Sequence, residues 1–129
     1  MLNKFKVGDT KTFTHVVNEG DIAKFSSGTV HNVYATFALG RDAEWASRQF
    51  VLEMKEEHEE GIGTMLTIEH QSPAMLGDKV VIEATIQKLE RNEIICTYTA
   101  KVNERVIAIG TTGQKILKKE KLKALFAAL

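Results

Sequence analysis

Residues 36–60 read TFALGRDAEWASRQFVLEMKEEHEE, and the spacing of their apolar residues decides the fold. These residues recur at intervals of four, three, four and four, which places them in one stripe along an α-helix. The stripe consists of Leu39, Ala43, Ala46, Phe50 and Met54. Gly61 follows directly, and glycine commonly ends helices. The sequence therefore predicts one long helix over residues 36–60.

The chain after Gly61 alternates between apolar and polar residues, as half-buried strands do. Turn residues divide it into four predicted strands, at 64–70, 80–90, 94–102 and 106–117, the last interrupted by Gly110 and Gly113. Because successive strands are joined by short turns, the pattern favours an antiparallel meander.

The part of the chain before the long helix has weaker patterns. Residues 12–17 predict a short strand. A turn at residues 18–21 follows, in which Asp21 is predicted to cap a short helix that runs to about Ser26. Ser26-Ser27-Gly28 interrupts the chain, and residues 29–33 predict a short extended segment.

Residues 118–129 predict a short amphipathic helix with lysines opposite an apolar side. A helix with an apolar stripe must bury that stripe, and a twisted sheet offers the surface. We therefore predict an α+β hotdog fold, in which an antiparallel β-sheet wraps around one long central helix. Residues 1–129 are predicted to form a single domain, because no linker divides them.

The composition excludes several classes of protein. The 129 residues include 17 Lys plus Arg and 17 Asp plus Glu, and a zero net charge argues against a dedicated nucleic-acid binder. A lone cysteine, Cys96, excludes an internal disulfide. No stretch approaches the roughly 18 apolar residues of a membrane helix, and the first residues lack the apolar core of a signal peptide. We expect a cytoplasmic protein that binds neither nucleic acid nor membrane.

The balanced charge is unevenly placed along the chain. Residues 41–60 hold three basic and seven acidic residues, a local charge of −4. Residues 115–123 hold five basic and one acidic residue, a local charge of +4. The basic segment is either a site that receives an anionic ligand or a solvated tail. The acidic run over residues 56–60 is interpreted as the solvated end of the long helix.

Few side chains form a known catalytic or metal-binding pattern. The four histidines show no HExxH spacing and the chain has no CxxC, so no metal site is predicted. Cys96 lies among alternating apolar residues and is interpreted as a buried structural thiol. His70 ends a predicted strand before a loop that contains Pro73. It is either a satisfied structural histidine or a functional one.

Several short motifs are more informative together than alone, because the spacing between them forms part of the pattern. They are Ser27-Gly28, Val33-Tyr34-Ala35-Thr36 with Glu44 eight residues on, Gly61-Ile62-Gly63-Thr64, His70 seven residues after Gly63, Gly77 seven after His70, and the strand at 107–110. In this arrangement the chain resembles the fluoroacetyl-CoA thioesterase family of hotdog proteins. The resemblance runs from about residue 5 to residue 118.

The resemblance implies that Thr36, Glu44 and His70 form the catalytic group and that Gly63 lies near the acyl pocket. It also implies a homodimer, or a dimer of dimers, with the acyl-CoA substrate bound at the interface between subunits. We expect no cofactor other than the CoA that the substrate carries.

The chain departs from the family pattern at three positions. Phe37 stands where the family usually has proline after the threonine. Thr112 and Gln114 stand where its last strand usually carries histidine and arginine. Phe37 and Gln114 therefore join Gly63 as candidate substrate contacts, and the acyl group accepted here is left open.

The candidate residue types suit the hydrolysis of a thioester. An imidazole titrates near neutral pH and can move a proton, and a carboxylate can orient it or activate water. The Thr36 hydroxyl is a candidate nucleophile or hydrogen-bond donor, and a backbone N–H near Gly63 or the helix start is a candidate oxyanion donor. Eight helical residues span about 12 Å, so Thr36 either lies before the helix or acts on another part of the substrate than Glu44. Without catalysis, Thr36 would be a helix N-cap and Glu44 a polar residue beside the stripe.

The favoured hypothesis is a thioesterase that hydrolyses a small acyl-CoA to the free acid and CoA. A non-catalytic module that binds or senses acyl-CoA is the first alternative, because Thr112 and Gln114 replace the family's histidine and arginine. An enoyl-CoA hydratase-type hotdog is the second, and the absence of an Asp-x4-His pair counts against it. Fold class alone does not separate these functions.

Overall fold

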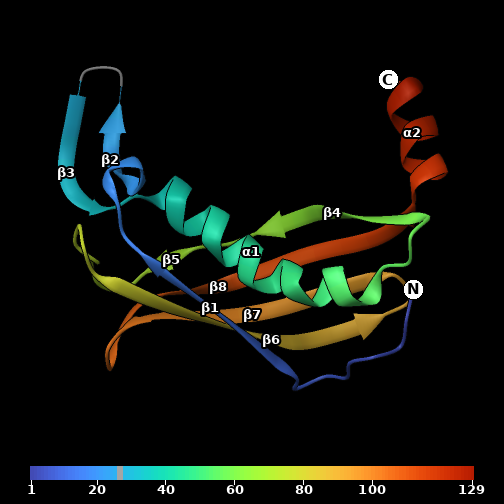
Figure 1. Ribbon diagram of the computed structural model, residues 1–129, viewed down its shortest axis with the longest axis horizontal. Helices are drawn as coiled ribbons and strands as arrows, with labels where there is room; N and C mark the ends of the chain where they lie inside the picture. The colour runs from blue at the N-terminus through green and yellow to red at the C-terminus, as the bar shows by residue number, and fades with distance from the viewer. Residues whose placement is uncertain (26–27) are drawn as a thin grey trace.

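A long helix, α1 (Thr36–Met54), lies across one face of a curled antiparallel sheet (Figure 1). The computed structural model describes residues 1–25 and 28–129. Within these ranges, six strands form one sheet in the order β1-β6-β7-β8-β4, with β5 paired to β8, while β2 and β3 form a separate hairpin. The predicted α+β arrangement of a sheet around one central helix is confirmed.

The remaining elements follow the chain order of the prediction, with changes at several ends. They are β1 (Thr10–Val16), the 3-10 helix η1 (Glu19–Asp21), β2 (Ile22–Phe25), β3 (Gly28–Tyr34), β4 (Glu59–Leu66), β5 (Glu69–His70), β6 (Lys79–Glu90), β7 (Glu93–Val102), β8 (Arg105–Lys118) and α2 (Lys119–Ala127). Every adjacent strand pair in the main sheet is antiparallel.

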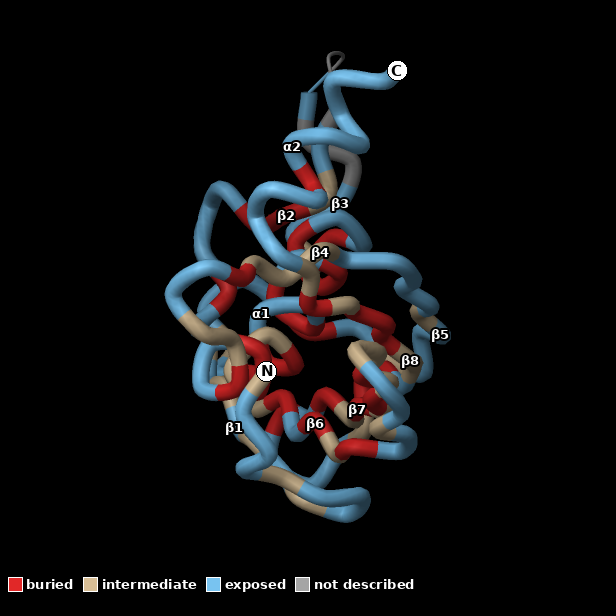
Figure 2. The backbone as a smooth tube through the Cα atoms, turned by 90° about the vertical axis from the view of Figure 1, so that its right-hand side faces the viewer, coloured by how far each residue is buried: buried red, intermediate tan, exposed pale blue. Residues whose placement is uncertain are grey.

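The core lies between α1 and the concave face of the sheet (Figure 2). All five residues of the predicted helix stripe are at most 1% exposed, which confirms the face assigned from their spacing. Alternate residues of β6 and β7 face them, as the period of a strand requires. These buried residues are Val80, Ile82, Ala84 and Ile86 in β6 and Ile94, Cys96, Tyr98, Ala100 and Val102 in β7.

The predicted helix end at residue 60 is wrong. The helix stops at Met54, the last residue of the stripe, and Lys55 adopts an extended conformation. The following residues pair with β8 instead, so that Gly61 lies inside β4 opposite Ile116. Without a further apolar residue on the helix face, continued helix would bury nothing, whereas the strand completes the sheet.

The acidic run is consequently not a solvated helix end. Glu59 is in β4 and only 8% exposed. The Met1 amino group donates to Glu56 at 2.6 Å and lies 2.8 Å from Glu59. Arg48 donates to Glu60 at 3.0 Å. Three of the four glutamates in this run are therefore paired.

The part before α1 also differs from the prediction. Asn18, rather than Asp21, caps η1, and the predicted helix beyond Asp21 is replaced by β2. The turn ends at Asp21 because Ile22 is extended and pairs with Tyr34 of β3. The Asp21 carboxylate accepts from the Asn18 N–H and the Arg41 guanidinium. The predicted extended segment at 29–33 is confirmed within β3. Ser26 and Ser27, including the Ser27 of the motif, lie outside the described residues.

Two strand predictions change at the edge of the sheet. The strand expected at 64–70 is divided into β4 and β5, because the backbone leaves the ladder at residues 67–68. The strand expected at 106–117 is continuous, since Gly110 and Gly113 both pair with β7 as ordinary members of β8. Their missing side chains make room for neighbours: a Cβ on Gly110 would overlap the Thr67 carbonyl oxygen.

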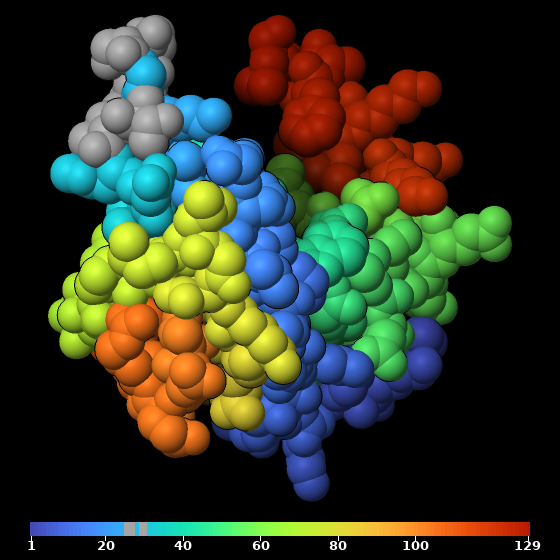
Figure 3. Space-filling view, turned by 60° about the vertical axis from the view of Figure 1, so that its left-hand side comes forward, coloured from blue at the N-terminus to red at the C-terminus, as the bar shows by residue number. Residues whose placement is uncertain are grey.

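The predicted C-terminal helix is confirmed as α2. Leu122 packs against the body with 8% exposure, while Leu125, Phe126 and Leu129 are 51%, 58% and 101% exposed. Figure 3 shows this helix projecting from the surface of the molecule. In the described part of the chain, none of the helices is both long and apolar enough to span a membrane.

Candidate active site

Thr36 and His70 meet at the start of α1. Thr36 Oγ1 lies 2.9 Å from His70 Nε2, although 33 residues separate the two along the chain. A cavity of about 370 Å³ opens beside the pair. Its walls come from Ala23, Val33, Tyr34, Ala35, Thr36, His70, Gln71, Ser72 and Pro73. The hydroxyl and the imidazole are both exposed, so a substrate can reach them.

The contact depends on how two elements begin and end. Ala35 is the N-cap of α1 and Thr36 its first helical residue, so the alternative in which Thr36 serves as the N-cap is wrong. The Thr36 hydroxyl is therefore not used for capping. β5 pairs His70 with Ala108 of β8, which holds the imidazole at the edge of the sheet.

The start of α1 adds backbone donors to this pair. The first N–H groups of a helix have no partner within the helix, and the helix dipole makes this end positive. No side chain caps α1. Amides of its first turn thus lie next to Thr36, where they can stabilise negative charge on a substrate oxygen.

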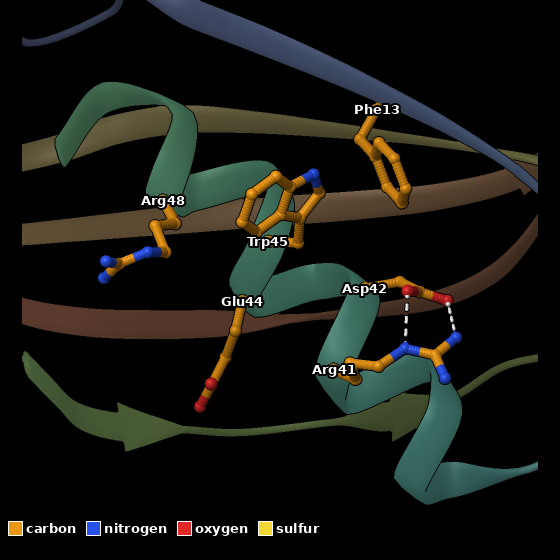
Figure 4. A pocket seen from close by; sticks show the side chains of 6 residues that line it. All are labelled: Phe13, Arg41, Asp42, Glu44, Trp45 and Arg48. Atoms are coloured by element: carbon orange, nitrogen blue, oxygen red, sulfur yellow. Dashed lines mark hydrogen bonds and ion pairs between the residues drawn. The ribbon is translucent and has the colours of Figure 1, made fainter. Parts of the chain in front are cut away.

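Glu44 does not join Thr36 and His70 within the chain. It lies two helical turns further along α1 and lines a different cavity, of about 480 Å³, with Phe13, Arg41, Asp42, Trp45 and Arg48. Figure 4 shows its side chain directed away from Phe13 and Trp45. Its Oε1 is 3.8 Å from the position that a Cβ on Gly63 would occupy. The structure therefore brings together two pairs: Thr36 with His70, and Glu44 with Gly63.

The three candidate substrate contacts lie in different surroundings. Gly63 is exposed in β4, and Phe37 is 59% exposed beside Thr36. Gln114 is only 5% exposed and pairs with Gly63 in the ladder, so its side chain is on the same face of the sheet as Glu44. Gln114 is thus a buried neighbour of Gly63 rather than an exposed residue.

Thr112 is buried between β8 and α1. It is 1% exposed, and its hydroxyl donates to Ser47 Oγ of α1 at 2.7 Å. Burial raises the pKa of the neighbouring Cys96 thiol to about 11, although hydrogen bonds with Ser47 and Thr112 favour the thiolate. These values agree with the interpretation of Cys96 as a structural thiol.

Sequence reasoning missed a group of buried charges behind the helix start. Asp21 is 1% and Asp42 4% exposed, and both bind the Arg41 guanidinium. The available signal was the position of Asp42 among the buried residues of α1, between Leu39 and Ala43. An aspartate there predicts a buried partner, since an unpaired buried charge is costly.

One group in the described residues has the spacing of metal ligands. Ligand atoms of Glu56, His58 and Glu59 lie within 4.8 Å of one another. Both carboxylates already contact the Met1 amino group, which lowers the pKa of Glu59. A cation would have to compete with that amine.

Comparison with solved structures defines the class of protein as a hotdog-fold thioesterase. A Thermus thermophilus hypothetical protein, described as a thioesterase superfamily member, is 33% identical over 98% of this chain and 94% of its own, with a TM-score of 0.92. A hot-dog-like protein from Thermanaerovibrio acidaminovorans is 17% identical over 96% of this chain and 92% of its own, with a TM-score of 0.87, and shows the fold alone.

The chain belongs to the fluoroacetyl-CoA-specific thioesterase family, whose sequence profile matches residues 17–120. The structure of the fluoroacetyl-CoA thioesterase FlK is 20% identical, covers 98% of both chains and has a TM-score of 0.87. A search of curated protein sequences finds no match. The predicted resemblance and the predicted class of enzyme, an acyl-CoA thioesterase, are confirmed.

Proposed function

We propose that this protein hydrolyses a small acyl-CoA thioester to the free acid and CoA, with Thr36, His70 and Glu44 as its catalytic group. The observation that carries the proposal is the 2.9 Å contact between Thr36 Oγ1 and His70 Nε2 beside an open cavity. A hydroxyl in contact with an imidazole is the arrangement of an activated nucleophile.

The chemistry follows from that contact. His70 Nε2 takes the hydroxyl proton while Thr36 Oγ1 forms a bond to the thioester carbonyl carbon, and the carbonyl oxygen becomes an oxyanion. Amides in the first turn of α1 stabilise this oxyanion. As the carbon–sulfur bond breaks, the CoA sulfur receives the proton from His70. Water, activated by the same imidazole, then cleaves the threonine ester and releases the acid.

The same pair also suits a direct attack by water. In that case the Thr36 hydroxyl donates a hydrogen bond to the substrate, and a carboxylate activates the water. Trapping a covalent acyl-threonine by mass spectrometry after rapid quenching separates the two routes. An acyl group on Thr36 supports the nucleophile, and its absence under full turnover supports the water route.

A second copy of the chain is proposed to supply the carboxylate. Glu44 and Gly63 lie together beside β4, the last strand in the order of the described sheet. Met65 and Leu66 of this strand are 39% and 37% exposed, an apolar edge suited to pairing with another strand. A two-fold dimer would set Glu44 of the partner subunit against Thr36 and His70, and each dimer would contain two such sites.

The remaining substrate contacts follow from this arrangement. Phe37 beside Thr36, and Gly63 with Gln114, are proposed to surround the acyl group and the thioester. The lysines of α2 are proposed to attract the CoA phosphates, since five basic residues lie within 115–123. The reaction needs no further cofactor in this scheme, and the free thiol of Cys96 suits the reducing cytoplasm.

A panel of short and medium acyl-CoA esters, assayed with a thiol-reactive dye, tests the proposed function. We expect turnover of at least one ester, and a fall in kcat of about 100-fold or more in Thr36→Ala, His70→Ala and Glu44→Gln. His58→Ala, which removes another exposed histidine, serves as the control and should keep wild-type kcat. If no ester turns over while calorimetry detects tight CoA-ester binding, the protein is a binding module and the proposal is wrong.

A further inference from the structure

Five side chains from four elements form a polar network behind the start of α1, and three of them are buried. His15 comes from β1, Asp21 from η1, Tyr34 from β3, and Arg41 and Asp42 from α1. Asp21 and Asp42 are 1% and 4% exposed, and Tyr34 is 5% exposed. The proposed chemistry uses none of the five.

The contacts run without a break through the network. His15 Nε2 lies 2.6 Å from Asp21 Oδ2, and Arg41 Nη2 donates to Asp21 Oδ1 at 2.8 Å. Arg41 also donates through Nε and Nη2 to the two oxygens of Asp42, both at 3.0 Å, as Figure 4 shows. The Tyr34 hydroxyl donates to Asp42 Oδ2 at 2.5 Å. Since a carboxylate only accepts, Nε2 of His15 carries the proton in its contact.

The same residues hold the backbone that leads into Thr36. The Asp21 carbonyl accepts the Ala35 N–H at 2.8 Å, at the N-cap of a helix that lacks a side-chain cap. Tyr34 and Ala35 line the cavity of the Thr36–His70 pair. Asp21 therefore fixes the helix start through its carbonyl, and its carboxylate ties that start to Arg41, one turn and a half along α1.

We propose that this network positions Thr36 for reaction, with Tyr34 and Arg41 as positioning residues that hold the first turn of α1 against His70. The proposal rests on the function assigned above to Thr36. Tyr34 precedes Thr36 by two residues, and its hydroxyl is anchored to Asp42, six residues after Thr36. The hydrogen bond between Tyr34 and Asp42 therefore joins the two ends of the segment that contains Thr36.

A purely structural role would not require buried charges. Replacing a buried ionic group by apolar side chains of similar volume is often neutral or stabilising. The Arg41 guanidinium instead binds both oxygens of Asp42, and such a bidentate contact fixes the orientation of the two side chains. Since a small misplacement of reacting groups costs rate steeply, fixed orientation at the helix start has a direct catalytic consequence.

Tyr34→Phe, which removes only one oxygen, tests the proposal, with Tyr98→Phe as the matched control. Tyr98 is also buried, at 2% exposure, and its hydroxyl donates to the Thr67 carbonyl at 2.7 Å, outside the network. We expect Tyr34→Phe to lower kcat about tenfold with KM changed less than about twofold, because only the geometry of the reacting groups is lost. Tyr98→Phe should leave both constants within about twofold of the wild type.

A spectroscopic readout separates this proposal from the proposed function. The ¹⁵N shift of His70 Nε2 reports its contact with Thr36, whether or not the protein turns over a given ester. We expect that signal to move in Tyr34→Phe and to stay in place in Tyr98→Phe. A shifted signal in a protein without esterase activity would support positioning while contradicting the function. An unmoved signal with unchanged kcat would overturn the positioning role.

Arg41 provides a second variant that does not bury a new group, since its side chain is 52% exposed. Arg41→Ala should lower kcat with little change in KM, and Arg41→Lys should recover only part of the loss, because a lysine cannot bind both oxygens of Asp42. Equal activity of all three proteins would contradict the proposal.

Discussion

Thr36 and Glu44 lie on the same helix, but only Thr36 contacts His70, at 2.9 Å. The resemblance to the family selected both residues, and their eight-residue spacing predicted that one helix cannot bring their side chains into direct contact. The contact between Thr36 and His70 could not be predicted in the same way, because it depends on β5 pairing with β8 across the end of α1. Pairing between distant segments leaves little local signal in a sequence.

Cys96 is predicted to be chemically inert in the folded protein. It is 1% exposed, and burial raises the pKa of its thiol to about 11, so little thiolate exists at about pH 8. We expect the native protein to resist a thiol-reactive dye, and the denatured protein to react at its single cysteine. Labelling of the native protein at the rate of a free thiol would contradict the buried placement.

Asp21 is predicted to contribute to acid sensitivity. Burial would raise its pKa, but hydrogen bonds from Asn18, Arg41 and His15 lower it overall. A carboxyl with a lowered pKa in the folded state stabilises the protein above about pH 4 and loses that contribution as the pH falls through the folded value. Asp21→Asn should therefore cost about 2 kcal/mol near neutral pH, and less at low pH.

Urea unfolding of Asp21→Asn and the wild type at decreasing pH measures this difference. Glu83→Gln, at an exposed position of β6, serves as the control and should follow the wild type at every pH. A difference between Asp21→Asn and the wild type that stays constant below about pH 4 would show that the charge of Asp21 does not contribute.

At the scale of elements, periodicity predicted faces better than ends. The stripe of α1 and the apolar–polar alternation in β6 and β7 were correct, since burial follows directly from the period of each element. The end of α1 was misplaced because residues 55–60 are nearly all charged and carry no period. Only Glu59 and Glu60 of these residues are in a strand, where they pair with β8. Glu56 and Glu59 contact the amino terminus, and Glu60 accepts from Arg48.

Gly110 is predicted to be essential for the packing of β8. A Cβ there would overlap the Thr67 carbonyl oxygen and lie 2.5 Å from the Tyr98 hydroxyl. We expect Gly110→Ala to lower the free energy of unfolding by about 3 kcal/mol, measured in urea. Gly63→Ala in the adjoining strand is the matched control, since its Cβ would meet only Glu44 at 3.8 Å. Equal stability of the two variants would contradict the close approach at Gly110.

At the scale of the whole molecule, the fold predicted from one helix stripe and four strands was correct. The uneven placement of charge in the sequence also has a structural counterpart. The Met1 amino group and Lys11 pair with carboxylates of the acidic segment, whereas most of the basic segment lies on the projecting helix α2. Within one chain, the Thr36–His70 contact and the Glu44–Gly63 contact lie apart, and the sequence did not predict that Glu44 would approach Gly63.

The site proposed to be shared between two subunits leads to a specific prediction for mixed dimers. Glu44→Gln and His70→Ala should each be nearly inactive alone. A mixed dimer contains one Glu44→Gln chain and one His70→Ala chain. It keeps one intact site, in which the Glu44→Gln chain supplies Thr36 and His70 and the His70→Ala chain supplies Glu44. Statistical mixing places half the dimers in this mixed form, and each contains one of two sites, so about a quarter of wild-type activity should return.

The proposed shared site is tested most directly by the kcat of these two variants after they are unfolded and refolded together. We expect recovery to about a quarter of the wild-type rate, with no recovery when each variant is refolded alone. A mixture as inactive as its components, with dimers present, would contradict a catalytic site built from Thr36, His70 and the carboxylate of a second chain.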